Sequence, residues 1–178
     1  GLPEILVGLF PGLGGTTRVA RMMGLMGASS VLLEGKLFAG DKAKSIGLVD
    51  EVVAEDELIQ KAKNWVLSAS PQDLIKPWDQ KGFKFPGGAP YHPGGFMSFV
   101  GASALVNGKT KGLYASAKAL LSSVYEGALV DFESALKIEA RWFTNVLMTD
   151  TCTNMARTLF LNKSALEKGK QRPSGTEE

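Results

Sequence analysis

Two residue types that often carry chemistry are almost missing from this sequence, which has one cysteine, Cys152, and one histidine, His92. A single cysteine excludes an intrachain disulfide, and Cys152 stands in a polar run without an adjacent base, so a nucleophilic role is not indicated. A Ser-His-Asp triad would need His92, yet no Gly-x-Ser-x-Gly elbow accompanies it. We therefore expect no metal site and interpret His92 as a loop residue.

The sequence also has no long apolar run and no large net charge. No apolar run approaches 18 residues, so no transmembrane span is predicted, and no signal peptide pattern is evident. The formal net charge of +2 over 178 residues favours neither nucleic acid nor an acidic membrane as a partner. The composition is that of a globular domain, and the start at Gly1 without a methionine suggests a processed product or a piece of a longer protein.

Residues 1–70 alternate extended and helical patterns, which predicts an α/β arrangement. Strands are expected at residues 5–7 and 48–53 because these runs are short, apolar or β-branched. Helices are expected from Thr16 or Thr17 to Gly24, at residues 28–33, at 42–46 with Asp41 as N-cap and Gly47 as stop, and at 55–68 with one apolar face.

The remainder changes character. Residues 71–108 are rich in glycine, proline and aromatic side chains, so we predict an ordered connecting segment without a long helix. Residues 109–168 predict two or three helices, one of them with a stripe of Phe132, Leu136, Ala140, Phe143 and Leu147, and a last one capped within residues 149–153. Residues 169–178 resemble a flexible tail.

The densest motif is LPEILVGLFPGLGGTTR at residues 2–18. It lacks the third glycine of a dinucleotide fingerprint and the Gly-Lys-Ser/Thr ending of a phosphate-binding loop. Glu4 follows Pro3 and precedes an apolar run, and a carboxyl group in apolar surroundings holds a proton more readily than one in water. The pattern alone favours a solvated or helix-capping carboxylate at Glu4.

Several motifs in order resemble the crotonase superfamily, which includes enoyl-CoA hydratases and isomerases. They are the Pro-Glu pair, the loop PGLGGT followed by Arg18, and the segment GDKAKSIGLV at residues 40–49. The resemblance covers about residues 1–70. It implies the C-terminal half of a crotonase-type β-β-α superhelix, followed by an α-helical linker region.

The resemblance implies roles for particular residues. Glu4 matches the catalytic acid/base at the substrate's C2, and Pro11, Gly12, Leu13 and Gly14 would help to shape the acyl pocket. A second glutamate and the oxyanion donors precede this motif in the family, so residues 1–178 alone are expected to be inactive. Position alone favours a core role for Phe160 and a solvated one for Lys163, whereas the resemblance implies that both bind coenzyme A.

The segments at residues 125–144, 76–79 and 154–162 are similar to the linker of multifunctional fatty-acid β-oxidation α-subunits. In those proteins a 3-hydroxyacyl-CoA dehydrogenase domain follows and holds NAD; no such fingerprint occurs here, so no cofactor is expected in this chain. The implied partners are an acyl-CoA thioester, the rest of the enzyme, a thiolase subunit and a second copy, but no nucleic acid. The implied compartment is the bacterial cytoplasm, with the mitochondrial matrix or the peroxisome left open.

Two alternatives stay open. The chain could be a non-catalytic structural linker that holds a hydratase and a dehydrogenase together. It could also serve another crotonase-type reaction, such as dehalogenation or thioester hydrolysis, although a glutamate at the position of Glu4 favours the hydratase and the Δ3,Δ2-isomerase.

Overall fold

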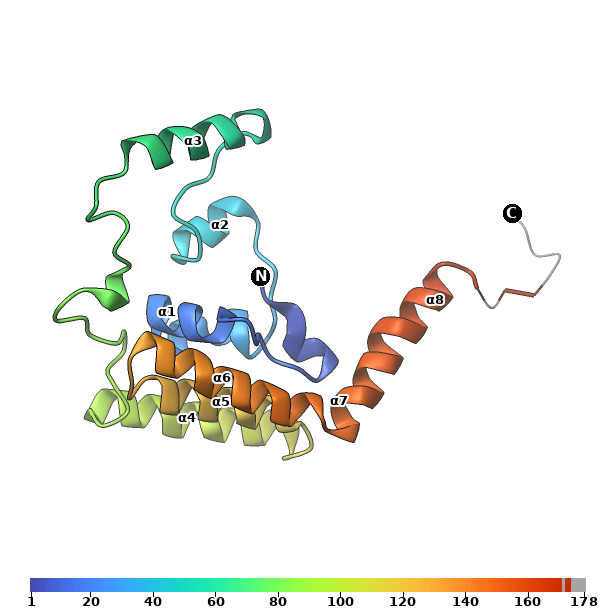
Figure 1. The fold of residues 1–178 in the computed structure, drawn as a ribbon. Helices are drawn as coiled ribbons and strands as arrows, with labels where there is room; N and C mark the ends of the chain where they lie inside the picture. The colour runs from blue at the N-terminus through green and yellow to red at the C-terminus, as the bar shows by residue number, and fades with distance from the viewer. Residues whose placement is uncertain (171, 174–178) are drawn as a thin grey trace.

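The computed structural model describes residues 1–170, 172 and 173, and within these residues the chain forms helices and turns without a β-strand (Figure 1). The 3-10 and π helices are η1 (Pro3–Val7), η2 (Glu55–Glu57), η3 (Pro77–Asp79) and the π-helical η4 (Ala156–Asn162). The α-helices are α1 (Gly15–Leu32), α2 (Gly40–Ser45), α3 (Leu58–Ser68), α4 (Pro93–Thr110), α5 (Ala115–Gly127), α6 (Phe132–Leu147), α7 (Asp150–Met155) and α8 (Lys163–Glu167). None of these helices combines the length and hydropathy that a membrane span requires. The tail predicted at residues 169–178 lies mostly outside the described residues.

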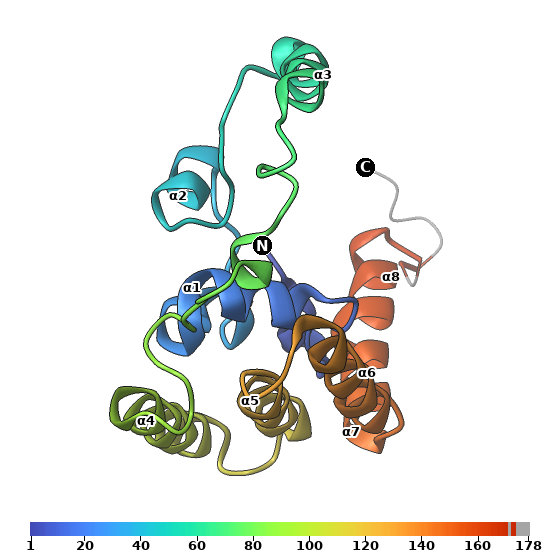
Figure 2. The same ribbon diagram turned by 60° about the vertical axis from the view of Figure 1, so that its left-hand side comes forward.

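Helices α1, α4, α5 and α6 form the packed body. Figures 1 and 2 show α4, α5 and α6 side by side, with α1 lying over them and in contact with all three. Gly127 lets α5 and α6 approach closely, since a Cβ at this glycine would lie 3.3 Å from the Cβ of Ala135.

The body buries two groups of apolar side chains. One joins α1 to α4, α5 and the connecting segment: Ala20, Leu25, Phe85, Phe99, Ala102, Val106, Ala117, Leu121 and Val124. The other joins the loop before α1 to α1, α5 and α6: Phe10, Val19, Ala28, Val31, Leu32, Ala119, Leu120 and Val146. The helices from residues 115–147 therefore complete a core that residues 1–33 begin.

Helix α1 contains the interruption that its sequence predicts. Gly24 has φ +70° and ψ 171°, and the backbone of Pro86 lies where a Cβ would be, so only glycine fits there. The helix resumes after Gly24 and ends at Leu32. The second helix, which the sequence predicts at residues 28–33, is therefore present and ends one residue earlier than predicted. The predicted cap is wrong, because the N-cap is Gly14 and neither Thr16 nor Thr17 caps the helix.

Both predicted strands are wrong. Residues 5–7 belong to the 3-10 helix η1, and residues 48–53 have no regular secondary structure. A strand needs a neighbour whose N–H and C=O groups complete its ladder, and among the described residues neither segment has one. The α/β expectation, and with it the β-β-α superhelix, is therefore not borne out within the described residues.

Helices α2 and α3 stand apart from the body in both views (Figures 1 and 2). The predicted stop at Gly47 is confirmed by its φ of +76°, but the N-cap of α2 is Ala39 and not Asp41. The amphipathic helix predicted at residues 55–68 is present as η2 and α3. Its apolar face is exposed, since α3 has no buried residue.

The connecting segment contains a helix that the proline argument missed. Helix α4 begins at Pro93, and a proline in the first turn costs nothing because its missing N–H would have no partner there. Before α4, the segment is ordered as predicted and packs aromatic side chains on the body: Phe85 is buried, and Trp78 stacks on Phe132 with ring centroids 5.6 Å apart.

The predicted stripe of α6 is displaced from the observed one. Ala135, Glu139 and Val146 are buried, whereas Ala140 and Leu147 are exposed. The prediction followed apolar residues only and so passed over Glu139. The predicted cap of the last helical arm is confirmed, because the hydroxyl of Thr149 accepts a hydrogen bond from the backbone N–H of Cys152 at 3.2 Å.

Candidate functional site

Glu4 lies in η1, a short 3-10 helix that Pro3 begins and Gly8 ends. Gly8 has φ +83°, and its N–H donates to the carbonyl of Ile5, which closes the helix. The Glu4 side chain is half-buried, and its Oε2 is fully buried without a hydrogen-bond partner. A buried carboxyl oxygen without a partner is costly, and a catalytic role is one of the reasons for which native proteins keep such an atom.

A pocket of about 580 Å³ opens beside Glu4. We call it the Glu4 pocket; its lining comes from η1 and from the arm formed by η4 and α8, and consists of Pro3, Glu4, Leu6, Val7, Leu159, Phe160 and Lys163. The fold thus brings Glu4 together with two other residues that the sequence singled out, Phe160 and Lys163, which lie 156 and 159 positions later in the chain. Figure 1 shows this arm rising from α7 towards α8 beside the N-terminal η1.

The arm presents Phe160 and Lys163 from an unusual backbone. Residues Ala156–Asn162 form a π-helix, a rare conformation that is frequent at functional sites. Phe160 is 61% exposed, and the ammonium of Lys163 lies 3.7 Å from the carboxylate of Glu167 in an exposed ion pair. An exposed pair of this kind is weak, so the Lys163 ammonium is available to an anion.

The glycine-rich loop after η1 does not line the Glu4 pocket. Pro11 is fully buried, Leu13 is 99% exposed, and a Cβ at Gly12 would overlap the ring of Phe143. Gly14 has φ +85° and is the N-cap of α1. The predicted contribution of these four residues to the acyl pocket stays a prediction, and the loop itself packs against α6.

Glu139 is the residue at this loop that sequence reasoning missed. It is 0% exposed, and its Oε1 accepts the N–H of Gly14 at 2.5 Å. Its Oε2 accepts the N–H and the hydroxyl of Thr17 at 2.7 and 2.6 Å. A carboxylate from α6 therefore caps the N-terminus of α1, where the helix dipole favours negative charge. The available signal was a charged residue between Leu136 and Phe143, on an otherwise apolar face.

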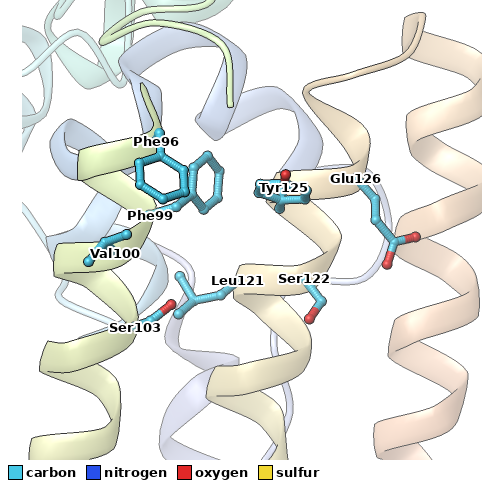
Figure 3. A pocket seen from close by; sticks show the side chains of 8 residues that line it. All are labelled: Phe96, Phe99, Val100, Ser103, Leu121, Ser122, Tyr125 and Glu126. Atoms are coloured by element: carbon cyan, nitrogen blue, oxygen red, sulfur yellow. The ribbon is translucent and has the colours of Figure 1, made fainter. Parts of the chain in front are cut away.

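A second pocket lies between α4 and α5 and has a volume of about 450 Å³. Figure 3 shows Phe96, Phe99 and Val100 of α4 opposite Leu121 and Tyr125 of α5, with Glu126 turned towards α6. Glu126 is engaged there by the indole N–H of Trp142 at 2.9 Å and by the guanidinium of Arg141. This pocket is a mostly apolar groove, and the one carboxylate on its lining, Glu126, is already paired with α6.

Metal and thiol chemistry find no support in the described part of the chain. No group of three or more His, Cys, Asp or Glu residues is arranged to hold a metal ion there. Cys152 is buried, and burial raises the pKa of its thiol, which disfavours the reactive thiolate.

Comparison with known sequences gives these observations a context. The family described as Enoyl-CoA hydratase/isomerase matches residues 1–74. The glyoxysomal fatty acid beta-oxidation multifunctional protein MFP-a of Cucumis sativus is 31% identical over 170 residues, which cover 92% of this chain and 22% of that protein. The fatty acid oxidation complex subunit alpha of Shewanella loihica is 32% identical over 168 residues, and that of Vibrio cholerae (strain O395) is 30% identical over 171 residues; each covers 94% of this chain and 23% of the relative.

The chain thus spans less than a quarter of the length of these relatives. The similarity nevertheless extends well beyond the 74 residues of the family match and includes residues 76–79, 125–144 and 154–162. The resemblance read from the motifs is confirmed: residues 1–74 match the enoyl-CoA hydratase/isomerase family, and nearly the whole chain is similar to part of a fatty acid beta-oxidation multifunctional protein and of fatty acid oxidation complex alpha subunits.

Proposed function

We propose that Glu4 is the acid/base carboxyl of a trans-2-enoyl-CoA hydratase site in a multifunctional β-oxidation protein that also carries 3-hydroxyacyl-CoA dehydrogenase. The observation that carries the proposal is the buried, unpartnered Oε2 of Glu4 in a pocket whose other walls are apolar except for Lys163. A carboxyl group in such surroundings suits proton transfer to carbon. NAD belongs, in this proposal, to the dehydrogenase part and not to residues 1–178.

The chemistry follows from the position of one carboxyl group. In hydration, the oxygen of water bonds to C3 of the enoyl thioester, and the electron pair of the double bond takes the proton of Glu4 at C2. In Δ3,Δ2-isomerisation, the same carboxylate removes a proton from C2 and returns it at C4. Hydration needs a second base for the water, whereas isomerisation needs Glu4 alone.

The second base is assigned to another part of such a protein. In the family that residues 1–18 resemble, the second glutamate and the oxyanion N–H donors precede the Pro-Glu pair. One oxyanion donor is worth about 10²–10³ in rate, so we expect residues 1–178 by themselves to hydrate enoyl-CoA negligibly. The proposed activity is that of a longer polypeptide.

Phe160 and Lys163 suit the nucleotide end of coenzyme A. A half-open phenylalanine ring offers a stacking surface for adenine, and an ammonium held only by a weak ion pair can attract a phosphate. Pro11, Gly12, Leu13 and Gly14 act indirectly in this proposal. They join η1 to the capped start of α1 and so help to fix the position of Glu4.

Binding of crotonyl-CoA to residues 1–178, measured by calorimetry, tests the site without requiring turnover. Phe160→Ala and Lys163→Ala should each weaken binding about tenfold, which corresponds to about 1.4 kcal/mol. Leu161→Ala is the matched control, because Leu161 is exposed on the same π-helix and does not line the Glu4 pocket. Equal affinity in all three variants would remove coenzyme A from this pocket.

The partners follow from the exposed surfaces. The apolar face of α3 supports self-association or packing against the rest of a larger protein, and a thiolase subunit is the further partner that the relationship suggests. Light scattering after size exclusion tests self-association, and a monodisperse monomer contradicts it.

The compartment we propose is bacterial cytoplasm or, as the name of the cucumber relative states for that protein, the glyoxysome.

A structural role is the second candidate function. It is favoured by Glu139, which ties the loop after η1 to α6 whether or not a substrate is present. In that case crotonyl-CoA would not bind residues 1–178, while the fold would stay intact.

A further inference from the structure

A further pocket, of about 530 Å³, lies between the connecting segment and the turn from α5 to α6. It shares no lining residue with the Glu4 pocket. Its volume falls within the range of about 300–1,000 Å³ that is usual for small-molecule sites. We call it the Arg21 pocket; its walls include five aromatic rings and four side chains that are charged or can be, namely Trp78, Phe83, Phe85, Tyr91, Phe132, Arg21, Lys84, His92 and Asp131.

Arg21 gives this pocket a buried cation with spare donors. The residue is 6% exposed, and its Nη2 donates to the carbonyl oxygens of Gly127 at 3.1 Å and Val130 at 2.9 Å. Among the described residues these are its only hydrogen bonds, so Nε and Nη1 keep three N–H donors. Nε and Nη1 have no hydrogen-bond partner within the described part of the chain, but they are not among the fully buried side-chain atoms. Both nitrogens therefore keep some solvent-accessible surface.

The nearby carboxylates do not take up these donors. Asp131 accepts the N–H and the hydroxyl of Ser134 at 2.9 and 2.8 Å, and so caps α6. Burial lowers the pKa of the Arg21 guanidinium, while Asp131 and Asp79 act on it in the opposite direction through their charge. Among the lining residues, Arg21 and Lys84 outnumber the one carboxylate, Asp131, so the lining itself has a single excess positive charge.

The walls of the pocket are largely aromatic. Trp78 and Phe132 stack on each other with an interplanar angle of 15°, and the guanidinium carbon of Arg21 lies 5.7 Å from the centroid of Phe132, so the cation adjoins this aromatic wall. Aromatic walls favour planar aromatic ligands, and a guanidinium with a free fork pairs well with phosphate or carboxylate.

We propose that the Arg21 pocket binds a small aromatic anion, a planar ring that carries a phosphate or carboxylate, with the anionic group paired to Arg21 and Lys84. A nucleoside monophosphate is the simplest ligand of this class. This site is separate from the Glu4 pocket and does not depend on the function proposed for it.

Titration with AMP while tryptophan fluorescence is recorded tests the proposal, because Trp78 lines the pocket. AMP should quench the emission saturably, and Trp78→Phe should remove that part of the signal. Adenosine and inorganic phosphate each supply only half of the ligand and should bind at least about tenfold more weakly.

Variants separate the contributions. Arg21→Lys keeps the charge but loses the fork, and it should weaken AMP binding about tenfold. Because Arg21 also supports the α5–α6 turn, Lys84→Ala is the second variant, expected to weaken binding about threefold by removing one exposed charge at short range. Lys81→Ala, an exposed lysine that does not line the pocket, should leave the affinity unchanged.

The controls distinguish this site from the Glu4 pocket. Phe160→Ala should leave the affinity read from Trp78 quenching unchanged, because Trp78 does not line the Glu4 pocket. A loss of this quenching in that variant would place the observed AMP in the Glu4 pocket and overturn the proposal. The proposal is equally overturned if AMP gives no saturable quenching in the millimolar range, or if adenosine binds as well as AMP.

Discussion

Helices α1 and α3 both lie in the part of the chain that matches the hydratase/isomerase family, yet their surroundings differ completely. Helix α1 has ten buried residues and a buried carboxylate at its N-terminus, whereas α3 has none buried although one of its faces is apolar. The difference comes from α5 and α6, which pack on α1 and do not reach α3 (Figure 2). An amphipathic pattern thus specifies a helix, but only a partner surface turns it into core.

The largest effect is expected where α6 holds α1. Glu139→Ala leaves the N–H groups of Gly14 and Thr17 without a partner in the core, which should lower the free energy of unfolding by about 3–5 kcal/mol. Urea denaturation measures it, with the exposed Glu133→Ala on the same helix as control. Equal stability of the two variants would show that the carboxylate does not secure α1.

A pair of leucines sharpens the comparison itself. Leu120 of α5 is 0% exposed, and Leu120→Ala should cost about 3 kcal/mol. Leu67 of α3 is 85% exposed, and Leu67→Ala should change the stability by less than about 0.5 kcal/mol. Urea denaturation of both variants decides this, and a large cost at Leu67 would mean that α3 is packed in solution.

A smaller loss is expected at the start of the arm that carries Phe160. Thr149 caps α7, and Thr149→Ala should destabilise that helix by about 1 kcal/mol. Hydrogen exchange of the backbone amides of residues 150–155 measures this locally. Unchanged exchange there, or an equal change in α5, would contradict a local capping role.

The smallest effect should appear only in acid. Two hydrogen bonds hold the pKa of Asp131 below its ordinary value of 3.8: the larger contribution comes from the backbone N–H of Ser134, and the smaller one from its hydroxyl. Because the folded-state pKa is the lower one, the stabilisation is complete above pH 3.8 and is lost as the pH falls through the folded-state pKa. Asp131→Asn should therefore flatten this part of the stability profile, measured by urea denaturation from pH 5 downwards in steps of about one unit.

The sequence predicts local features better than their placement. As predicted, Gly24 interrupts α1, Gly47 follows the end of α2, and Thr149 caps α7. These roles depend on only a few neighbouring residues, which is why the sequence predicts them. The strands at residues 5–7 and 48–53 failed because a strand depends on a distant partner that no local pattern reveals. Helix α4 was missed because Pro93 was taken as a breaker and not as a first-turn residue.

The candidate site divides in the same way. Glu4, Phe160 and Lys163 were chosen by resemblance, and the structure lines one pocket with them, although nothing in residues 1–18 points to residue 160. Glu139 escaped notice because its role depends on two backbone N–H groups in another helix, which a pattern of side chains does not display.

The rate of crotonyl-CoA hydration with and without Glu4 tests the central claim most directly. We would measure it in residues 1–178 alone and in a fusion that places before Gly1 the segment of the cucumber relative that precedes its region of similarity to this chain. The account predicts negligible activity for residues 1–178, activity for the fusion, and a loss of about 10²–10⁴ in the Glu4→Gln fusion with crotonyl-CoA binding retained. A Glu4→Gln fusion that hydrates crotonyl-CoA as fast as the unchanged fusion would contradict it.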